Sequence, residues 1–421
     1  MRNRKMWTII VSGLFLSSII AGISGAFLII EGELTTLLWE VLPAQMKWPI
    51  LYYFVLCVLG ALVLSYLKKR FGQVPQTAHE ALTELKAKQS VDYSGVFRNL
   101  LAALVILIFG AGVGPEAALL GAIISLSVWQ SDKLWYLYFH YDEQEQQAFW
   151  TKIQRLLHPQ QFVQRYDTML APVDKKKLKQ VMNGLFIVNG LVVFTFLMKL
   201  VGHPSFITKL GTGKIEMASL WLILPALLTA FVIGNAYQWL QAALAKLCQP
   251  FEEKQSILVS FGAACIFLFV ILMPRLLFSG QSFMHLVPSF GSQQAWYILV
   301  VAAIMKLVFL QVCLQTGWIG GDIFPVVFSA ILIGFAVAQF FPTIDSLFVV
   351  AIFATSLTTQ ILGTILVPGI FVGLFFPITL WPIVVLVLFL QWLFKTSIYS
   401  TEKSSHLNNS KSNKHQQKSM T

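Results

Sequence analysis

Two short segments of the sequence combine glycine and proline in a way that exposes backbone amides. Residues 110–115 read Gly-Ala-Gly-Val-Gly-Pro, and residues 317–325 read Gly-Trp-Ile-Gly-Gly-Asp-Ile-Phe-Pro. Glycine lets the chain turn sharply, proline suits the first turn of a helix, and a helix start presents free N–H groups at the positive end of its dipole. Two such starts that converge would form an anion site without a fully charged side chain.

Two carboxylates accompany these glycine segments. Glu116 directly follows Pro115, and Asp322 directly precedes the second helix start. The dipole of its own helix would stabilise the Glu116 carboxylate as a structural charge, but this side chain could also swing toward the glycine segment and act as a gate. A carboxylate repels a bound anion, so we expect the backbone N–H of Asp322, and not its side chain, to face the ion path.

Other patterns in the sequence predict no chemistry. It contains no His-Glu-x-x-His or Gly-x-Ser-x-Gly motif, and the Gly-Thr-Gly-Lys segment at 211–214 lacks two residues that a phosphate loop requires. The four cysteines are widely spaced and read as buried apolar residues: Cys57, Cys248, Cys265 and Cys313. We therefore expect no enzymatic activity, no cofactor and no bound metal.

The composition indicates the solvent in which these segments must act. The 421 residues are 57% hydrophobic and only 12% charged, with a mean hydropathy of +0.71. A soluble chain of this length cannot bury so much apolar surface, whereas a membrane-spanning helix needs roughly 20 mostly apolar residues. The apolar runs are continuous and do not alternate as barrel strands do. We predict an all-α polytopic integral membrane protein that contacts lipid and has no nucleic-acid partner.

The apolar runs that must position the glycine segments are uneven in length. They lie near 7–30, 48–67, 96–109, 115–129, 182–201, 217–245, 256–279, 295–316, 324–341, 345–366 and 369–394. Several are too short to cross a bilayer and are joined by Gly- and Pro-rich breaks, which is typical of the broken, partly inserted helices of transporters.

The two glycine segments also predict how the chain is organised. One falls in each half, so we predict two pseudo-repeated halves, 1–205 and 206–395, followed by a short basic cytoplasmic tail at 396–421. The first half includes a polar interval at 130–180 that suits interfacial helices or a cytoplasmic loop.

The distribution of charge predicts the orientation in the membrane. The chain has 30 Lys and Arg against 19 Asp and Glu, a net charge of +11. Basic residues precede the first apolar run and follow the second at 68–70, whereas Glu31, Glu33 and Glu40 lie between the two runs. By the positive-inside rule, both termini and the second loop are cytoplasmic in a protein of the plasma membrane.

The order and spacing of these segments resemble the CLC family of voltage-gated chloride channels and proton-coupled chloride antiporters. The family motif Gly-Ser-Gly-Ile-Pro falls on 71–75, Gly-Lys/Arg-Glu-Gly-Pro on 111–115, and Gly-x-Phe-x-Pro on 321–325. The resemblance implies an anion site at Gly72, Gln73, Val74, Pro75, Gly112, Val113, Gly114, Pro115, Gly321, Asp322, Ile323 and Phe324, with Tyr399 as the pore tyrosine. It also implies a homodimer with one path per subunit, which carries chloride or a similar anion.

The sequence departs from the family motifs at the glutamates that carry protons in the antiporters and at one residue that contacts the anion. Val113 stands where antiporters carry the gating glutamate, and Gly72 replaces the anion-contacting serine. Residues 198–200 read Met-Lys-Leu where a second, inward-facing glutamate is expected. These losses predict a channel-like or uncoupled anion path. The alternative is a proton-coupled chloride or fluoride antiporter that uses Glu116 as a displaced gate.

A cation-coupled solute transporter is the alternative from another class. Such a protein also uses broken helices, but it would normally place Asp or Glu inside its spans to hold the cation. Apart from Glu116, Asp322 and Asp345, the spans are nearly free of acids. The scarcity of acids favours the anion.

Overall fold

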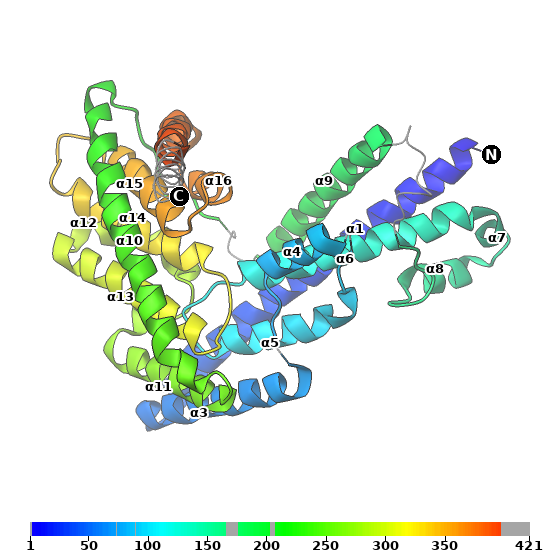
Figure 1. The fold of residues 1–421 in the computed structure, drawn as a ribbon, viewed down its shortest axis with the longest axis horizontal. Coiled ribbons are helices and arrows are strands. Elements are labelled where there is room, and N and C mark those ends of the chain that lie inside the picture. Colours follow the sequence, from blue (N-terminus) through cyan, green and yellow to red (C-terminus); the bar gives the residue numbers. More distant parts are fainter. Residues whose placement is uncertain (1, 73, 89, 166–175, 203–206, 397–421) are drawn as a thin grey trace, which may run out of the picture. The chain divides into compact units, whose positions relative to one another are not determined.

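The computed structural model describes residues 2–72, 74–88, 90–165, 176–202 and 207–396 (Figure 1). Within these ranges the regular structure is helical, and the sole β-type contact is an isolated bridge between Gly114 and Gly321. Seven helices in the described ranges are long and apolar enough to cross a membrane: Arg4–Gln45, Pro49–Phe71, Gln180–Val201, Met217–Phe251, Gln255–Leu272, Trp296–Gln315 and Ile378–Thr396. The predicted all-helical membrane fold is confirmed.

The chain divides into two compact units. Unit 1 comprises Met1–Phe206, Ala245–Ser279 and Phe309–Phe324, and unit 2 comprises Ile207–Leu244, Gly280–Val308 and Pro325–Thr421. Unit 1 holds α1 (Arg2–Thr36), the π-helical turn η1 (Leu37–Val41), α2 (Leu42–Gln45), α3 (Pro49–Phe71), α4 (Ala78–Lys88), α5 (Val96–Ile108), α6 (Glu116–Phe139), α7 (Tyr141–Glu145), α8 (Phe149–Leu157), α9 (Lys176–Val201) and α11 (Gln255–Leu272). Unit 2 holds most of α10 (Ile223–Cys248), together with α12 (Val287–Gln293), α15 (Ser346–Ile361) and α16 (Leu366–Gly373). Two helices that lead into and out of the second glycine segment change unit along their length, α13 (Trp296–Gln315) and α14 (Ile323–Ala338).

Small and polar residues bring the helices of unit 1 close together. Helix α1 runs beside α9 and α6, and α3 runs beside α11 (Figure 1). A β-carbon on Gly13 would lie 2.2 Å from the Phe186 ring, so α1 and α9 approach each other where that glycine has no side chain. Asn189 of α9 donates a hydrogen bond to Ser17 Oγ at 2.8 Å. Small residues and hydrogen bonds of this kind associate helices in lipid, where the hydrophobic effect between helices is absent.

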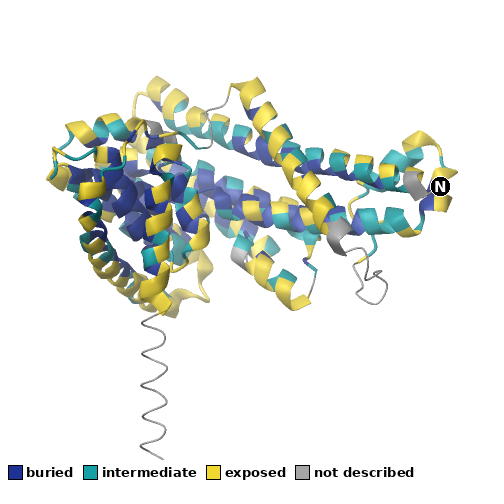
Figure 2. Cartoon of the chain, turned by 90° about the horizontal axis from the view of Figure 1, so that it is seen from above, coloured by how far each residue is buried: buried dark blue, intermediate teal, exposed yellow. Residues whose placement is uncertain are grey.

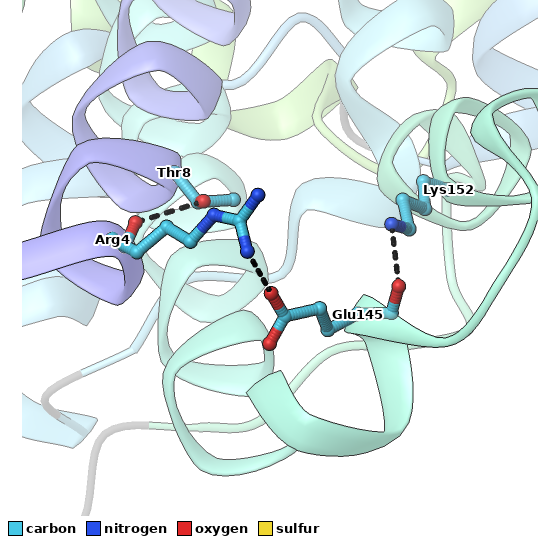
Figure 3. A network of polar contacts seen from close by, with 4 residues as sticks. All are labelled: Arg4, Thr8, Glu145 and Lys152. Atoms are coloured by element: carbon cyan, nitrogen blue, oxygen red, sulfur yellow. Dashed lines mark hydrogen bonds and ion pairs between the residues drawn. The ribbon is translucent and has the colours of Figure 1, made fainter. Parts of the chain in front are cut away.

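The predicted polar interval lies within unit 1, where it supplies the last turns of α6, the short helices α7 and α8 and the first residues of α9. Arg4 Nη1 lies 3.2 Å from Glu145 Oε1, and Lys152 Nζ donates to the Glu145 carbonyl oxygen at 2.9 Å (Figure 3). Lys133, which is 1% exposed, donates to the carbonyl oxygens of Arg155 at 2.8 Å and Gln161 at 2.6 Å. The interval is therefore tied to both α1 and α6.

Unit 2 is built around two buried helices, α14 and α15. Figure 2 shows the buried positions gathered on the inner sides of the helices and the exposed positions on the outer sides. A β-carbon on Gly334 would lie 2.9 Å from Val350 Cα, so α14 and α15 pack almost backbone to backbone. Asp345 caps α15 by accepting hydrogen bonds from Leu347 N and Phe348 N at 2.9 and 3.1 Å.

Candidate functional site: two glycine breaks and one carboxylate

The two glycine segments have the same backbone path. Helix α5 ends at Ile108 and α13 ends at Gln315, and the second residue after each end is a glycine with positive φ: +88° at Gly110 and +87° at Gly317. Only glycine adopts this conformation without strain, and it turns the chain out of the helix. The next helices then begin at equivalent positions, α6 at Glu116 and α14 at Ile323.

A pair of hydrogen bonds joins the two segments at their glycines. Gly114 N donates to Gly321 O, and Gly321 N donates to Gly114 O, both at 2.7 Å. The neighbouring Val113 is fully buried, and its Cγ2 lies 2.4 Å from the position of a β-carbon on Gly320. Gly112 N donates to the Cys313 sulfur at 3.3 Å. The structure thus brings residues 112–115 and 321–324 together, at the starts of α6 and α14.

The Glu116 carboxylate lies over this glycine bridge. A β-carbon on Gly114 would be 1.9 Å from Glu116 Oε2, and one on Gly321 would be 2.1 Å from Glu116 Cδ. The carboxylate therefore fits only because both positions lack a side chain. Glu116 is 5% exposed.

The two carboxylate oxygens differ in their partners. Oε1 accepts a hydrogen bond from Phe324 N at 3.1 Å, so the carboxylate lies at the start of α14 and not only of its own helix. Oε2 is buried and has no hydrogen-bond partner among the described residues. Leaving such an acceptor unpaired costs about 1–3 kcal/mol, and more for a charged group. The site is thus a helix start that already accommodates a carboxyl group, one oxygen of which has no hydrogen-bond partner among the described residues.

The first predicted motif lies farther along α6. Gly72 ends α3 with φ of +80°, and Val74 and Pro75 are buried. The next residue contacts α6 at Gly121, where a β-carbon would lie 3.1 Å from Gln76 O. Gly121 is about one and a half turns beyond Glu116. Gln73 and Tyr399 lie outside the described residues.

Two residues that the sequence reasoning did not place at the site cover the first glycine of each break. Trp39 of η1 lies on Gly110, where a β-carbon would be 2.7 Å from the indole ring, and its Nε1 donates to Ile108 O at 2.8 Å. Lys68 of α3 lies on Gly317, where a β-carbon would be 2.5 Å from Nζ. Neither residue belongs to a motif, because both contacts join positions far apart in the sequence.

The described residues contain no group of three or more His, Cys, Asp or Glu side chains that could hold a metal ion. The polar groups at the bridge are the backbone amides of the two segments, the Glu116 carboxylate and the neighbouring Asp322. Backbone amides at two helix starts bind an anion in preference to a cation.

Comparisons with known proteins address the architecture. No protein-family model matches this sequence, and no curated protein matches it. The structure is similar to the crystal structure of a CLC-type fluoride/proton antiporter, at 17% sequence identity over 91% of this chain and 94% of that chain, with a TM-score of 0.62. A slow cyanobacterial Cl⁻/H⁺ antiporter is 14% identical over 90% of this chain and 94% of that chain, with a TM-score of 0.62.

A third similar structure is that of a eukaryotic CLC transporter, 12% identical over 91% of this chain and 70% of that chain, with a TM-score of 0.61. At such identities the likeness concerns the fold. The resemblance predicted from the glycine motifs is confirmed at that level: this chain has the architecture of the CLC transporters.

Proposed function

We propose that this chain carries a small monovalent anion across a membrane between the starts of α6 and α14, with chloride as the expected ion. The position of the Glu116 carboxylate carries the proposal. A negative group from one helix lies at the start of another, where the free N–H groups and the dipole of α14 favour an anion. A helix start that accepts a carboxylate also accepts a halide when the carboxylate leaves. The CLC architecture supports the same function.

Glu116 acts as the gate of this path. A halide and the carboxylate compete for Phe324 N and cannot both occupy the space above Gly114 and Gly321. Protonation removes the charge that holds the carboxylate at the dipole, so lower pH favours its release and the entry of the ion. Val113, at the family's gate position, has no titratable group and is fully buried.

Coupling to protons is a second candidate, favoured by the unpaired Oε2 atom of Glu116. If each release of the carboxylate takes up one proton, anion movement and proton movement are linked. An inward-facing carboxylate that would pass the proton on is missing at 198–200, where Lys199 and Leu200 are exposed. Uncoupled transport and proton-coupled transport therefore differ in one measurable quantity, the proton flux that accompanies the anion.

The experiment is efflux from liposomes that contain the purified chain, followed with a chloride or fluoride electrode and a pH electrode together. We expect wild-type efflux to rise as the pH falls, because protonated Glu116 leaves the site. Glu116→Gln should remove this pH dependence. Asp322→Asn, which removes a neighbouring acid but leaves the Glu116 carboxyl group in place, should retain a pH dependence, with its midpoint moved.

The outcomes separate the candidates. Proton movement that accompanies wild-type efflux and disappears in Glu116→Gln indicates an antiporter, whereas anion efflux without proton movement indicates an uncoupled path. If neither chloride nor fluoride moves in the wild type, the proposed function is wrong.

The cation-coupled alternative receives less support from the acids in the structure. The Asp345 carboxylate is engaged as the cap of α15, and it also accepts from Lys214 N at 3.1 Å. Asp345 N in turn donates to Glu216 Oε1 at 2.8 Å. Replacing sodium with potassium in the liposome assay should leave the efflux unchanged, and a strict dependence on sodium would favour this alternative.

A further inference from the structure

Helix α8 (Phe149–Leu157) separates its apolar and polar side chains onto opposite faces. Its apolar residues are Phe149, Trp150, Ile153, Leu156 and Leu157. At about 100° per residue, these positions fall within about 120° of the helix surface. Phe149 and Trp150 are 69% and 73% exposed. Two large aromatic side chains exposed on one apolar face indicate a contact with an apolar phase or partner.

Contacts between α1 and α6 give the depth of this region in the membrane. The apolar run of α1 starts at Trp7, just after the charged Lys5. Lys5 Nζ lies 4.2 Å from the centroid of the Tyr138 ring, so the end of α6 is level with the polar end of α1. Gln130 Nε2 donates to Gly13 O at 2.9 Å, eight positions deeper along both helices. Eight helical residues advance about 12 Å, so this contact lies within the apolar run of α1.

The end of α8 is fixed at this depth by donors from α6. Lys133 Nζ donates to the carbonyl oxygen of Arg155, in the last turn of α8, at 2.8 Å. Trp129 Nε1 donates to Pro159 O, just beyond the helix, at 3.0 Å. The last carbonyl groups of a helix have no partner within the helix, and in lipid they must find one in the protein. A helix end satisfied by α6 therefore suits a position that is shielded from water.

The charges around α8 are of one sign. Residues 146–165 contain three basic residues and no acid: Lys152, Arg155 and Arg165. Basic side chains on the polar face of an interfacial helix attract lipid phosphates, while the apolar face enters the acyl region. Trp135 and Tyr138 pack on each other at the end of α6, and these residue types are enriched at membrane interfaces. Both features favour phospholipid as the partner of α8.

We propose that α8 lies in the membrane interface at the end where α1 begins, with Phe149 and Trp150 among the lipid acyl chains and Lys152 level with the phosphates. Interfacial helices bury their apolar face about 5–10 Å into the boundary between headgroups and acyl chains, which agrees with the depth given by Lys5 and Gln130. The positive-inside rule assigns this end to the cytoplasmic leaflet. The proposal concerns lipid contact and does not depend on the proposed anion transport.

The test measures the depth of nitroxide spin labels in phospholipid liposomes. Labels are attached to Trp150→Cys, to Lys152→Cys on the opposite face of α8, and to Glu143→Cys on α7, in a chain whose four free cysteines are replaced by alanine. Oxygen dissolves in lipid and a nickel chelate stays in water, so their relative effects on each label give its depth. We expect the Trp150 label about 5–10 Å below the phosphates, the Lys152 label at the phosphates and the Glu143 label in water.

Two results would overturn the proposal. A Trp150 label that responds mainly to the nickel chelate, as the Glu143 label should, would place α8 in water. A Trp150 label protected from both reagents would show that protein, such as a second copy of this chain, covers the apolar face.

A second measurement needs no cysteine variants. Lipids with brominated acyl chains quench tryptophan fluorescence on contact, and the difference between wild type and Trp150→Phe reports on Trp150 alone. We expect brominated liposomes to quench more fluorescence in the wild type than in Trp150→Phe. Equal quenched intensity in the two proteins would mean that Trp150 does not reach the acyl chains, and α8 would then not be an interfacial helix.

Discussion

The two glycine breaks share a backbone and differ in the side chains that complete it. Gly110 corresponds to Gly317 and Gly114 to Gly321, but the first helical residue is Glu116 in one break and Ile323 in the other. The repeated backbone supplies two helix starts joined by a symmetrical pair of hydrogen bonds. The difference between Glu116 and Ile323 means that one carboxylate, that of Glu116, lies on the glycine bridge itself, with Asp322 next to it in the sequence of the second segment.

One carboxylate on the bridge itself suits the centre better than a carboxylate at the first helical position of both segments or of neither. Two carboxylates about 4 Å apart would repel each other by about 4 kcal/mol at an effective dielectric constant of 20. With none, Phe324 N would lose the acceptor that it has in Glu116 Oε1. The difference between Glu116 and Ile323 therefore provides one side chain that competes with an anion. Without this difference, the two glycine segments would present equivalent backbone groups to the ion.

The side chains that cover Gly110 and Gly317, the first glycine of each break, differ as well. An indole lies on Gly110, and an ammonium group lies on Gly317. The indole is rigid, neutral and hydrogen-bonded to the end of α5, whereas the lysine is flexible and charged. One break is thus closed by packing, and the other presents a positive charge.

The largest effect is expected from Gly321→Ala, which tests whether the two breaks must both lack side chains at the bridge. The new methyl group would overlap the Glu116 carboxylate, so one of them must move. Overpacking of this kind costs about 1–3 kcal/mol of unfolding free energy. We expect a lower unfolding temperature in detergent, followed by tryptophan fluorescence, and an anion flux that depends less on pH because the carboxylate is expelled.

Two controls isolate the cause. Gly22→Ala places a methyl group where nothing lies within 4 Å, so it should leave the unfolding temperature unchanged. Glu116→Ala made together with Gly321→Ala removes the overlap, so the double variant should lose at least about 1 kcal/mol less than the sum of the two single variants. Additive losses would show that Gly321 is needed for another reason.

An intermediate effect is expected from a comparison of Gly110→Ala with Gly317→Ala. Both positions have positive φ, which costs a non-glycine residue about 1–2 kcal/mol. At Gly110 the methyl group also meets the Trp39 ring, whereas at Gly317 it meets the movable end of Lys68. Gly110→Ala should therefore be the more destabilising of the two, by about 1 kcal/mol.

Gly363→Ala supplies the reference for that comparison. Gly363 is the second residue after the end of α15 and has φ of +68°, but nothing lies within 4 Å of the added carbon, so this variant measures the backbone cost alone. Thermal unfolding of the three variants side by side gives the contribution of each cover. Equal losses at Gly110 and Gly317 would contradict the distinction between a rigid cover and a flexible one.

The sequence was sufficient for the fold class and for the location of the breaks, because both depend on local physics. A backbone in lipid must satisfy its own hydrogen bonds, so long apolar runs predict helices, and glycine marks where they stop. The second helix start was predicted as well, because α14 begins at Ile323, directly after Asp322. Pro115 precedes α6, but Pro325 is the third residue of α14, so the equivalent residues are Glu116 and Ile323 and not the two prolines.

The contacts that define the site could not be predicted because they join distant positions. Glu116 and Phe324 are 208 residues apart, and Trp39 and Ile108 are 69 apart. Composition and spacing indicate that Glu116 lies at a helix start, but only the fold shows that its carboxylate reaches a second helix. From the sequence, Lys68 indicated only the orientation of the chain in the membrane, since a basic residue after an apolar run usually marks the cytoplasmic side.

The smallest effect is expected from Trp39→Phe, which tests how much the cover over the first break depends on its hydrogen bond. Phenylalanine keeps a ring on Gly110 and against Tyr53, which stacks on Trp39 with centroids 5.6 Å apart, but it cannot donate to Ile108 O. The loss should be about 0.5–1.5 kcal/mol of unfolding free energy. Trp7→Phe, at a position that is 66% exposed, is the matched control and should cost nothing measurable. If Trp39→Phe costs no more unfolding free energy than Trp7→Phe, the hydrogen bond of the indole does not stabilise the first break, and the ring covers Gly110 by packing alone. The cover of the first break by Trp39 would then be less rigid, relative to the cover of the second break by Lys68, than the contacts indicate.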